Sequence, residues 1–227
     1  MLALSSAFGV VISLTGYGLG VLAKNKLHKG LCNPLLISIL FVIAVLKLTG
    51  ISYDTYNSSA KYISYLLTPA TVSLAIPLYL QIEKLRKNLP AILIGVLSGT
   101  LASMGSIAAM AALFKLSHKE YVTLLPKSIT TAIGMGVSEE LGGYVTISVA
   151  VIIITGIIGN LLADLVCRLF RITDPIAKGL ALGTASHAIG TTKAMEMGET
   201  EGAMSSLAIV VAGLMTVIGA SVFAQIM

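Results

Sequence analysis

The stretch Gly183–Ser206, GTASHAIGTTKAMEMGETEGAMSS, carries a histidine, a lysine and three glutamates between two apolar segments. Ionisable side chains inside a membrane span are costly, so they tend to line a pathway or to pair with one another. Lys193 could attract an anionic substrate, and His187 could hydrogen-bond that substrate or take up a coupled proton near neutral pH. The alternatives for Lys193 are snorkelling from the end of its helix and an ion pair with Glu196, one turn further on.

A second concentration of polar and flexible residues is PKSITTAIGMGVSEELGG, Pro126–Gly143. Its apolar part, Pro126–Val137, is too short to span a membrane comfortably. Hydroxyl groups here could line a cavity with Lys127 at its mouth, and Glu139 or Glu140 could be a proton or cation site. The alternative is a solvated reversal with two surface glutamates. The hydroxyl residues concerned are Ser128, Thr130 and Thr131.

Asn160 and Asp164 lie four residues apart on one apolar segment. This spacing places both on one helix face, so they could line the interior. Asp164 is then a candidate for proton coupling, as are His187 and Glu139. The alternative is that Asp164 pairs with Arg168, one turn further on.

Composition sets the class of protein that must position these groups. Of 227 residues, 56% are hydrophobic and only 11% are charged, and the mean hydropathy is +0.94. A typical soluble domain has roughly 25% charged residues, so this chain is expected to be an integral membrane protein. Its apolar runs are long enough to cross about 30 Å of hydrocarbon and lack the alternation of barrel strands. The predicted fold is an all-α polytopic membrane protein.

The remaining composition excludes several functions. The net charge of +5 comes from short basic loops such as Lys24–Lys29 and Lys84–Lys87, which are typical of topology signals and not of a nucleic-acid surface. Cys32 and Cys167 indicate neither a disulfide framework nor a metal site. Nucleotide-binding and hydrolase motifs are missing, so we expect neither an enzyme nor a cofactor.

Seven apolar segments are expected to enter the membrane. They are Leu2–Ala23, Pro34–Leu48, Tyr62–Leu80, Leu89–Leu116, Tyr144–Leu169, Lys178–Met195 and Ala203–Met227. The first has no basic residues before it, so we expect a retained span and not a cleaved signal peptide. Pro69 and Pro77 interrupt the third segment, and Gly183 and Gly190 interrupt the sixth, so both are predicted to be discontinuous.

An offset of 113 residues relates two halves, 1–117 and 118–227. It lays Ser73–Pro77, SLAIP, on Ser186–Gly190, SHAIG, and keeps the order of the segments. The basic loops make the EKLRK sequence cytoplasmic and Ser52–Ser59 an external loop. If Pro126–Val137 enters the membrane and returns without crossing, the corresponding EMGET sequence is external; if Pro126–Val137 crosses fully, the topology of the second half is reversed. The first of these topologies predicts two inverted repeats, the plan of a secondary transporter.

Discontinuous helices in corresponding positions indicate a substrate site near the middle of the bilayer. The free amides and positive dipole end of a broken helix suit a carboxylate. Alternatively, these small and hydroxyl residues are ordinary helix-packing residues. Those expected at the site are Thr71, Ser73, Ser186, Gly190 and Thr191, with Thr184 and Thr192 as further hydroxyls.

The two long motifs PKSITTAIGMGVSEELGG and GTASHAIGTTKAMEMGETEGAMSSLAIVVAGLMTV resemble the LrgB/CidB/YohK family of bacterial membrane proteins. The resemblance implies a bacterial cytoplasmic membrane protein, described as holin- or antiholin-like, that works beside a small LrgA/CidA-type partner. It extends to the carboxy-terminal half of the plastidic glycolate/glycerate translocator and to bacterial pyruvate-uptake proteins, which implies transport of small monocarboxylates. Some relatives have proline where Ala132 stands.

Two functions are therefore expected. The first is a carrier for a small monocarboxylate such as pyruvate, lactate, glycolate or glycerate. We expect such a carrier to form a homodimer through a scaffold part. The second is a holin-like pore or a regulator of murein hydrolase export. Paired interrupted segments favour the carrier, because a pore needs an amphipathic wall and no substrate cage.

Overall fold

The computed structural model describes residues 7–27, 34–66, 69, 72–73 and 75–227. The chain divides into two compact units, Met1–Ser73 and Leu74–Met227. Apart from turns, the described residues are helical, and three described helices are long and apolar enough to cross a membrane: Arg86–Phe114, Val145–Leu169 and Glu199–Ile226. The prediction of an all-α polytopic membrane protein is confirmed.

The first unit contains three described helices: α1 (Phe8–Leu27), α2 (Pro34–Thr49) and α3 (Tyr53–Ser64). The backbone of α1 lies directly against α3, where the Gly9 amide donates to Ser59 Oγ at 2.8 Å. The prediction that Ser52–Ser59 is a loop is wrong. Ser52 caps α3 by accepting a hydrogen bond from the Thr55 amide, so the helix starts directly after it.

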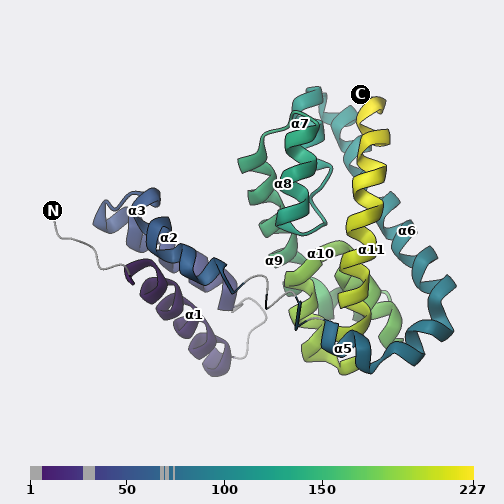
Figure 1. Ribbon diagram of the computed structural model, residues 1–227, viewed down its shortest axis with the longest axis horizontal. Coiled ribbons are helices and arrows are strands. Elements are labelled where there is room, and N and C mark those ends of the chain that lie inside the picture. Colours follow the sequence, from purple (N-terminus) through teal and green to yellow (C-terminus); the bar gives the residue numbers. More distant parts are fainter. Residues whose placement is uncertain (1–6, 28–33, 67–68, 70–71, 74) are drawn as a thin grey trace. The chain divides into compact units, whose positions relative to one another are not determined.

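The second unit holds the remaining described helices, which Figure 1 labels. They are α5 (Ala75–Leu80), α6 (Ile82–Phe114), α7 (His118–Leu124), α8 (Thr131–Glu140), α9 (Val145–Leu169), α10 (Pro175–Met197) and α11 (Glu199–Phe223), with a short 3-10 turn at Ala224–Ile226. The predicted loop Lys84–Lys87 is wrong, because these residues form the first turns of α6, and Pro90 is accommodated inside it. Within the predicted third span, α3 ends at Ser64 and two turn residues follow it, whereas Pro69, Val72 and Ser73 are helical. Pro77 lies inside α5, and the interruption expected at Pro69 stays a prediction.

Helices α6 and α11 run in the same direction. Near their starts, Lys84 Nζ donates to Thr200 Oγ1 at 2.8 Å, and further along Met104 packs against Gly219. We call the end where both helices start the lower end of this unit and the end where they finish the upper end, as drawn in Figure 1.

Helix α10 reverses direction at His187 and does not cross. His187 has φ 42° and ψ −139°, and a Cβ added to Gly190 would lie 2.6 Å from the Leu182 carbonyl oxygen, which a straight helix would hold about 12 Å away. The first arm runs parallel to α11, because Gly179 contacts Glu201 and Gly183 contacts Ser205. The returning arm runs back beside the same residues, as described next.

Two contacts place the returning arm. Thr191 Oγ1 and Ser205 Oγ are 2.7 Å apart, and Met195 packs against Gly202. The first arm of α10 therefore starts at the lower end, and the returning arm ends there. Extending the register of the first arm places its tip beside α11 about ten residues from the start of that helix, or roughly 15 Å deep. This depth is about half of the hydrocarbon core.

Helices α7 and α8 form a second reversing pair, which enters from the upper end. The Tyr121 hydroxyl donates to the Phe223 carbonyl at 2.8 Å, which places the start of α7 beside the end of α11. At the base of the pair, Ser148 Oγ on α9 donates to the Thr123 carbonyl at 2.7 Å and lies 2.7 Å from Ser138 Oγ, from whose hydroxyl it can accept. The turn between α7 and α8 therefore points into the bundle, opposite to the tip of α10.

Helix α9 connects the two hairpins from the upper to the lower end, so each hairpin is followed by one crossing helix, and the two pairs run in opposite directions. The predicted discontinuity of Lys178–Met195 is confirmed, but its crossing is wrong. Because α10 turns back, the predicted external stretch Glu196–Glu201 lies at the same end as Lys178. It is also not a loop: Gly198 alone separates α10 from α11, and Glu201 is buried.

The relation between residues 1–117 and 118–227 stays a prediction, since the first unit is described by itself. Helices α6 and α11, which the 113-residue offset pairs, run in the same direction, so this pair does not support inversion of the halves. The opposed arrangement that the structure describes lies within the second unit, between the hairpin α7–α8 with α9 and the hairpin of α10 with α11.

The reversal of α10 makes a direct topological prediction. In a background carrying Cys32→Ser and Cys167→Ser, the substitutions Lys178→Cys and Glu199→Cys should react with a membrane-impermeant maleimide from the same side. Lys119→Cys, at the upper end, should react from the opposite side. Labelling of positions 178 and 199 from opposite sides would mean that α10 crosses.

Candidate functional site

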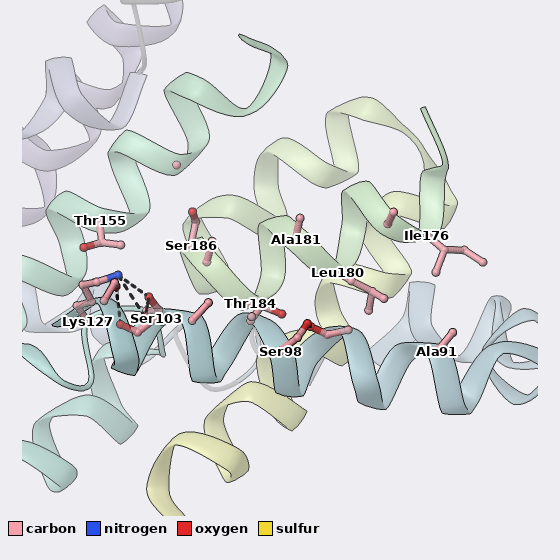
Figure 2. A pocket seen from close by; sticks show the side chains of 18 of the residues that line it. Ala91, Ser98, Ser103, Lys127, Thr155, Ile176, Leu180, Ala181, Thr184 and Ser186 are labelled. Carbon is pink, nitrogen blue, oxygen red and sulfur yellow. Dashed lines mark hydrogen bonds between the residues drawn. The ribbon is translucent and has the colours of Figure 1, made fainter. Parts of the chain in front are cut away.

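A cavity of about 950 Å³ lies in the second unit between α6, α9, the first arm of α10 and the turn that precedes α8 (Figure 2). One long wall is the face of α6 formed by Ala91, Gly95, Ser98, Gly99, Ala102, Ser103 and Ser106. This face is close to α10 because its side chains are small: a Cβ added to Gly99 would lie 2.9 Å from Thr184 Cγ2. Small residues thus bring the helices together without filling the space between them.

The polar end of the cavity is formed by Lys127 and two serines (Figure 2). Lys127 Nζ donates to Ser103 Oγ at 3.2 Å and to Ser128 Oγ at 3.1 Å, and the two hydroxyl oxygens are 2.9 Å apart. Within the described part of the chain, no carboxylate forms an ion pair with Lys127. This ammonium therefore faces the cavity with neutral partners only.

Lys127 lies near the middle of the membrane-spanning part of the unit, although the helices on either side of it are too short to span. Its partner Ser103 is close to the centre of the apolar segment Arg86–Phe114, whose middle residue is number 100. An unpaired cation far from water is unfavourable, and a bound anion with hydrogen-bonding oxygens would compensate it. The geometry is thus suited to a small anion.

Hydroxyl groups of α10 continue the polar lining. Thr184 and Ser186 both border the cavity, and both residues are more than nine-tenths buried. The Thr184 hydroxyl has no hydrogen-bond partner among the described residues. A buried hydroxyl without a partner costs about 1–3 kcal/mol, which a ligand oxygen in the cavity would recover.

His187 forms the tip of the α10 hairpin and packs against α9. Its Nε2 lies 3.0 Å from the Ile152 carbonyl oxygen, which can only accept, so Nε2 carries the hydrogen. A Cβ added to Gly156 would lie 2.8 Å from the imidazole ring, and Gly159 is in similar contact with Ser186. His187 does not border the cavity. Its contacts position Ser186, which does.

The predicted site residues divide into those that border the cavity and those that pack around it. Ser128 and Ser186 border it. Thr130 is the N-cap residue of α8 and Thr131 is the first residue of that helix. Gly190 and Thr191 hold the two arms of α10 to each other and to α11.

The other predicted residues lie elsewhere. Lys193 Nζ forms ion pairs with Asp164 Oδ2 at 2.8 Å and with Glu196 at 3.6 Å, so Asp164 pairs with the returning arm of α10 and not with Arg168. Glu139 is exposed near the end of α8. Ser73 is exposed in the first unit, and Thr71 lies outside the described residues. The participation of these residues in a site stays a prediction.

Sequence reasoning missed Ser103 and Thr155, and it placed Lys127 at the mouth of a cavity instead of in its wall. The available signal was the spacing of small and hydroxyl residues along Arg86–Phe114, which marks one helix face. That pattern is also typical of ordinary membrane helix packing. Only the contact of this helix face with the α7–α8 turn distinguishes a cavity wall from ordinary helix packing.

The fold and the cavity define a polytopic α-helical membrane protein in which two reversing hairpins reach a buried polar site from opposite ends. Comparison with known proteins assigns the particular family. The LrgB-like family model matches residues 13–226, so the chain belongs to the LrgB family. No solved structure matches this chain.

Three similar proteins carry the same name. "Antiholin-like protein LrgB" of Bacillus subtilis (strain 168) is 38% identical over 225 residues, which cover 98% of this chain and 97% of that protein. The proteins of the same name in Bacillus mycoides (strain KBAB4) and Bacillus cereus (strain B4264) are each 40% identical over 212 residues, 93% of this chain and 92% of theirs.

The contact between α9 and the α10 tip can be tested with two alanine substitutions. Gly159→Ala should push Ser186 away and lower the free energy of unfolding by about 1–3 kcal/mol, because the site is already closely packed. Gly136→Ala is the matched control: it lies in α8 with open space around it, and alanine there should stabilise the helix by up to about 1 kcal/mol. Thermal unfolding in detergent measures both, and equal melting temperatures would contradict the contact.

The ion pair between Asp164 and Lys193 can be tested by a double-mutant cycle of Asp164→Asn and Lys193→Gln. The two side chains are 50% and 20% exposed, so their coupling should be about 0.5–1 kcal/mol in unfolding experiments. Arg168→Gln should show no coupling with Asp164→Asn. A coupling energy near zero for the first pair would mean that it does not hold the returning arm of α10.

Proposed function

We propose that this protein is a membrane carrier for a small anion, of the monocarboxylate class that includes pyruvate, lactate, glycolate and glycerate. The observation that carries the proposal is the Lys127 ammonium, which lies at mid-depth in a cavity with hydroxyl partners only. A carboxylate can accept charge-assisted hydrogen bonds from this ammonium and further bonds from serine hydroxyls. These donors discriminate for anions without requiring a metal or a cofactor.

The arrangement of the hairpins supports transport over simple binding. The α10 tip reaches the cavity from the lower end, and the α7–α8 turn reaches it from the upper end. Movement of one hairpin at a time would expose the anion to one side while the other side stays closed, as alternating access requires. Irregular backbone at this depth is tolerated because protein surrounds it.

Coupling to protons is part of the proposal. Asp164 with Lys193 is the candidate pair, since protonation of the carboxylate would release the returning arm of α10. His187 and Glu139 remain candidates from the sequence. Of these two, His187 would act through the position of the hairpin tip, because its ring contacts α9.

A second candidate function is favoured by the names of the relatives, which are antiholin-like proteins. In that role the protein would regulate a pore or murein hydrolase export, together with a small LrgA-like membrane protein. The same proposal includes location in a bacterial cytoplasmic membrane, homodimerisation and a requirement of this protein for the LrgA-like partner. An anion site is compatible with both functions, since a regulator could respond to the anion that it binds.

Reconstituted vesicles separate the two functions. Purified protein, with and without the LrgA-like partner, should take up labelled pyruvate, lactate, glycolate or glycerate with saturable and stereoselective kinetics. Release of trapped dyes of unrelated size and charge would support the pore and contradict the carrier. Absence of both activities, with anion binding retained, would favour the regulator.

Lys127 is the residue whose substitution should matter most. Lys127→Met should weaken anion binding and saturable uptake about 10- to 100-fold, because a hydrogen bond to a charged group contributes about 1.5–3 kcal/mol. Lys127→Arg should retain part of both. The matched control is Lys119→Met, whose ammonium lies 4.3 Å from the Tyr144 ring centroid at the upper end, and which should leave uptake within about twofold. Normal uptake by Lys127→Met at equal membrane abundance would overturn the proposed site.

A further inference from the structure

A separate cavity of about 630 Å³ lies at the lower end of the second unit. It is formed where α9 ends, where the chain turns toward α10, and where α11 starts. Its lining residues are Asp164, Cys167, Arg168, Arg171, Ile172, Thr173, Lys178, Met197 and Glu201. None of these residues borders the cavity that holds Lys127, so a ligand bound here would not occupy the proposed carrier site.

Three cations face this cavity. Arg168 is in the last turn of α9, Arg171 follows directly after that helix, and Lys178 is in the first turn of α10. Over the described ranges, no carboxylate lies within ion-pair distance of any of them. Asp164 does not neutralise them, because it pairs with Lys193. The cavity therefore has an excess of positive charge and several guanidinium and ammonium donors.

The backbone directs Arg171 to this position. Arg171 adopts a left-handed conformation with φ 53°, and the Ile172 amide donates to the Cys167 carbonyl at 2.8 Å. This closes the carboxyl end of α9 in the manner for which glycine is usual. An arginine at this position places a cation beside the free carbonyls of the helix end and next to Arg168.

The wall also contains a buried carboxylate. Glu201 is 8% exposed and lies in the first turn of α11. A simple inorganic anion would be repelled by it, whereas a ligand that combines a phosphate with hydroxyl groups could use both the cations and this acceptor. The donor and acceptor set thus fits a phosphoglycerol group better than a bare anion.

Apolar surface continues directly from the cavity along α9. Leu165, Leu169 and Phe170 are 61%, 71% and 69% exposed, and α9 is one of the described helices long enough to cross a membrane. Basic side chains at the end of such a helix lie at the level of the lipid headgroups. A ligand held in the cavity by its polar part could therefore extend acyl chains along these side chains.

We propose that this lower cavity binds the headgroup of an anionic phospholipid with a glycerol head. Arg168, Arg171 and Lys178 contact the phosphate diester, Glu201 accepts hydrogen bonds from the headgroup hydroxyls, and the acyl chains lie against α9. A lipid bound at this site would hold the carboxyl end of α9 and the base of the α10 hairpin at one membrane surface.

The test compares lipid binding by the full-length protein in detergent, measured by native mass spectrometry and by the shift in melting temperature. The probes are phosphatidylglycerol, phosphatidylcholine, glycerol phosphate and inorganic phosphate. Phosphatidylglycerol should bind and stabilise the protein, and phosphatidylcholine should not. If inorganic phosphate or glycerol phosphate stabilises equally and phosphatidylglycerol adds nothing, the site is a free-phosphate site and the lipid proposal is overturned.

Matched charge variants decide whether the cavity is responsible. The triple variant Arg168→Gln, Arg171→Gln and Lys178→Gln should lose roughly 100-fold in phosphatidylglycerol affinity, since each basic residue near anionic lipid contributes about fivefold. The control is Lys84→Gln, Arg86→Gln and Lys87→Gln, which removes the same charge at the same end but outside the cavity. Equal losses in both variants would reveal a general surface charge effect and overturn the proposal.

Three single variants cover the case in which the triple variant fails to fold. Arg168→Gln and Lys178→Gln, made singly, should each weaken binding about fivefold while the melting temperature without lipid stays unchanged. Glu201→Gln should weaken the binding of phosphatidylglycerol more than that of phosphatidic acid, which lacks the glycerol hydroxyls of the headgroup. Unchanged binding in the Arg168→Gln and Lys178→Gln variants would contradict the assignment of the phosphate.

Discussion

The reversal of the chain at His187 is the constraint on which the second unit depends. A turn at mid-depth frees backbone amides and carbonyls that lipid cannot satisfy, so other parts of the protein must surround it. Helix α9 does this on one side, where Ile152 accepts the hydrogen bond from His187, and α11 does it on the other, where Ser205 pairs with Thr191. The glycines of α9 and α10 are consequences of this enclosure, because larger side chains would separate the arms from their neighbours.

The same enclosure produces the polar cavity. Holding α10 against α6 and α9 with small residues leaves space along α6, and the α7–α8 turn closes that space from the other end. Lys127 is carried into the bundle by this turn and not by a crossing helix. A cation at mid-depth is thus a result of hairpin geometry. Its lack of a carboxylate partner among the described residues is the basis of the anion site that we propose.

The two ends of the second unit also differ in charge. The lower end gathers the basic residues of α6, α9 and α10, whose excess is typical of a cytoplasmic surface, while the upper end has few. The buried Glu201 and the ion pairs of Lys193 lie at this same lower end, so polar groups surround the base of the α10 hairpin.

Sequence alone determined the class of protein, the order of the apolar segments, the discontinuity of Lys178–Met195 and the family, because hydropathy, helix-interrupting residues and long motifs act locally along the chain. It also identified the two stretches that contain Lys127, Ser128, Ser186 and His187. Whether an interrupted helix continues or turns back depends on one φ angle and on the partners of the freed backbone groups, which belong to other helices. Only the tertiary structure decided that α10 reverses, that Glu196–Glu201 joins the basic end, that Asp164 pairs with Lys193, and that Ser103 meets Lys127, because each of these facts is a contact between segments distant in sequence.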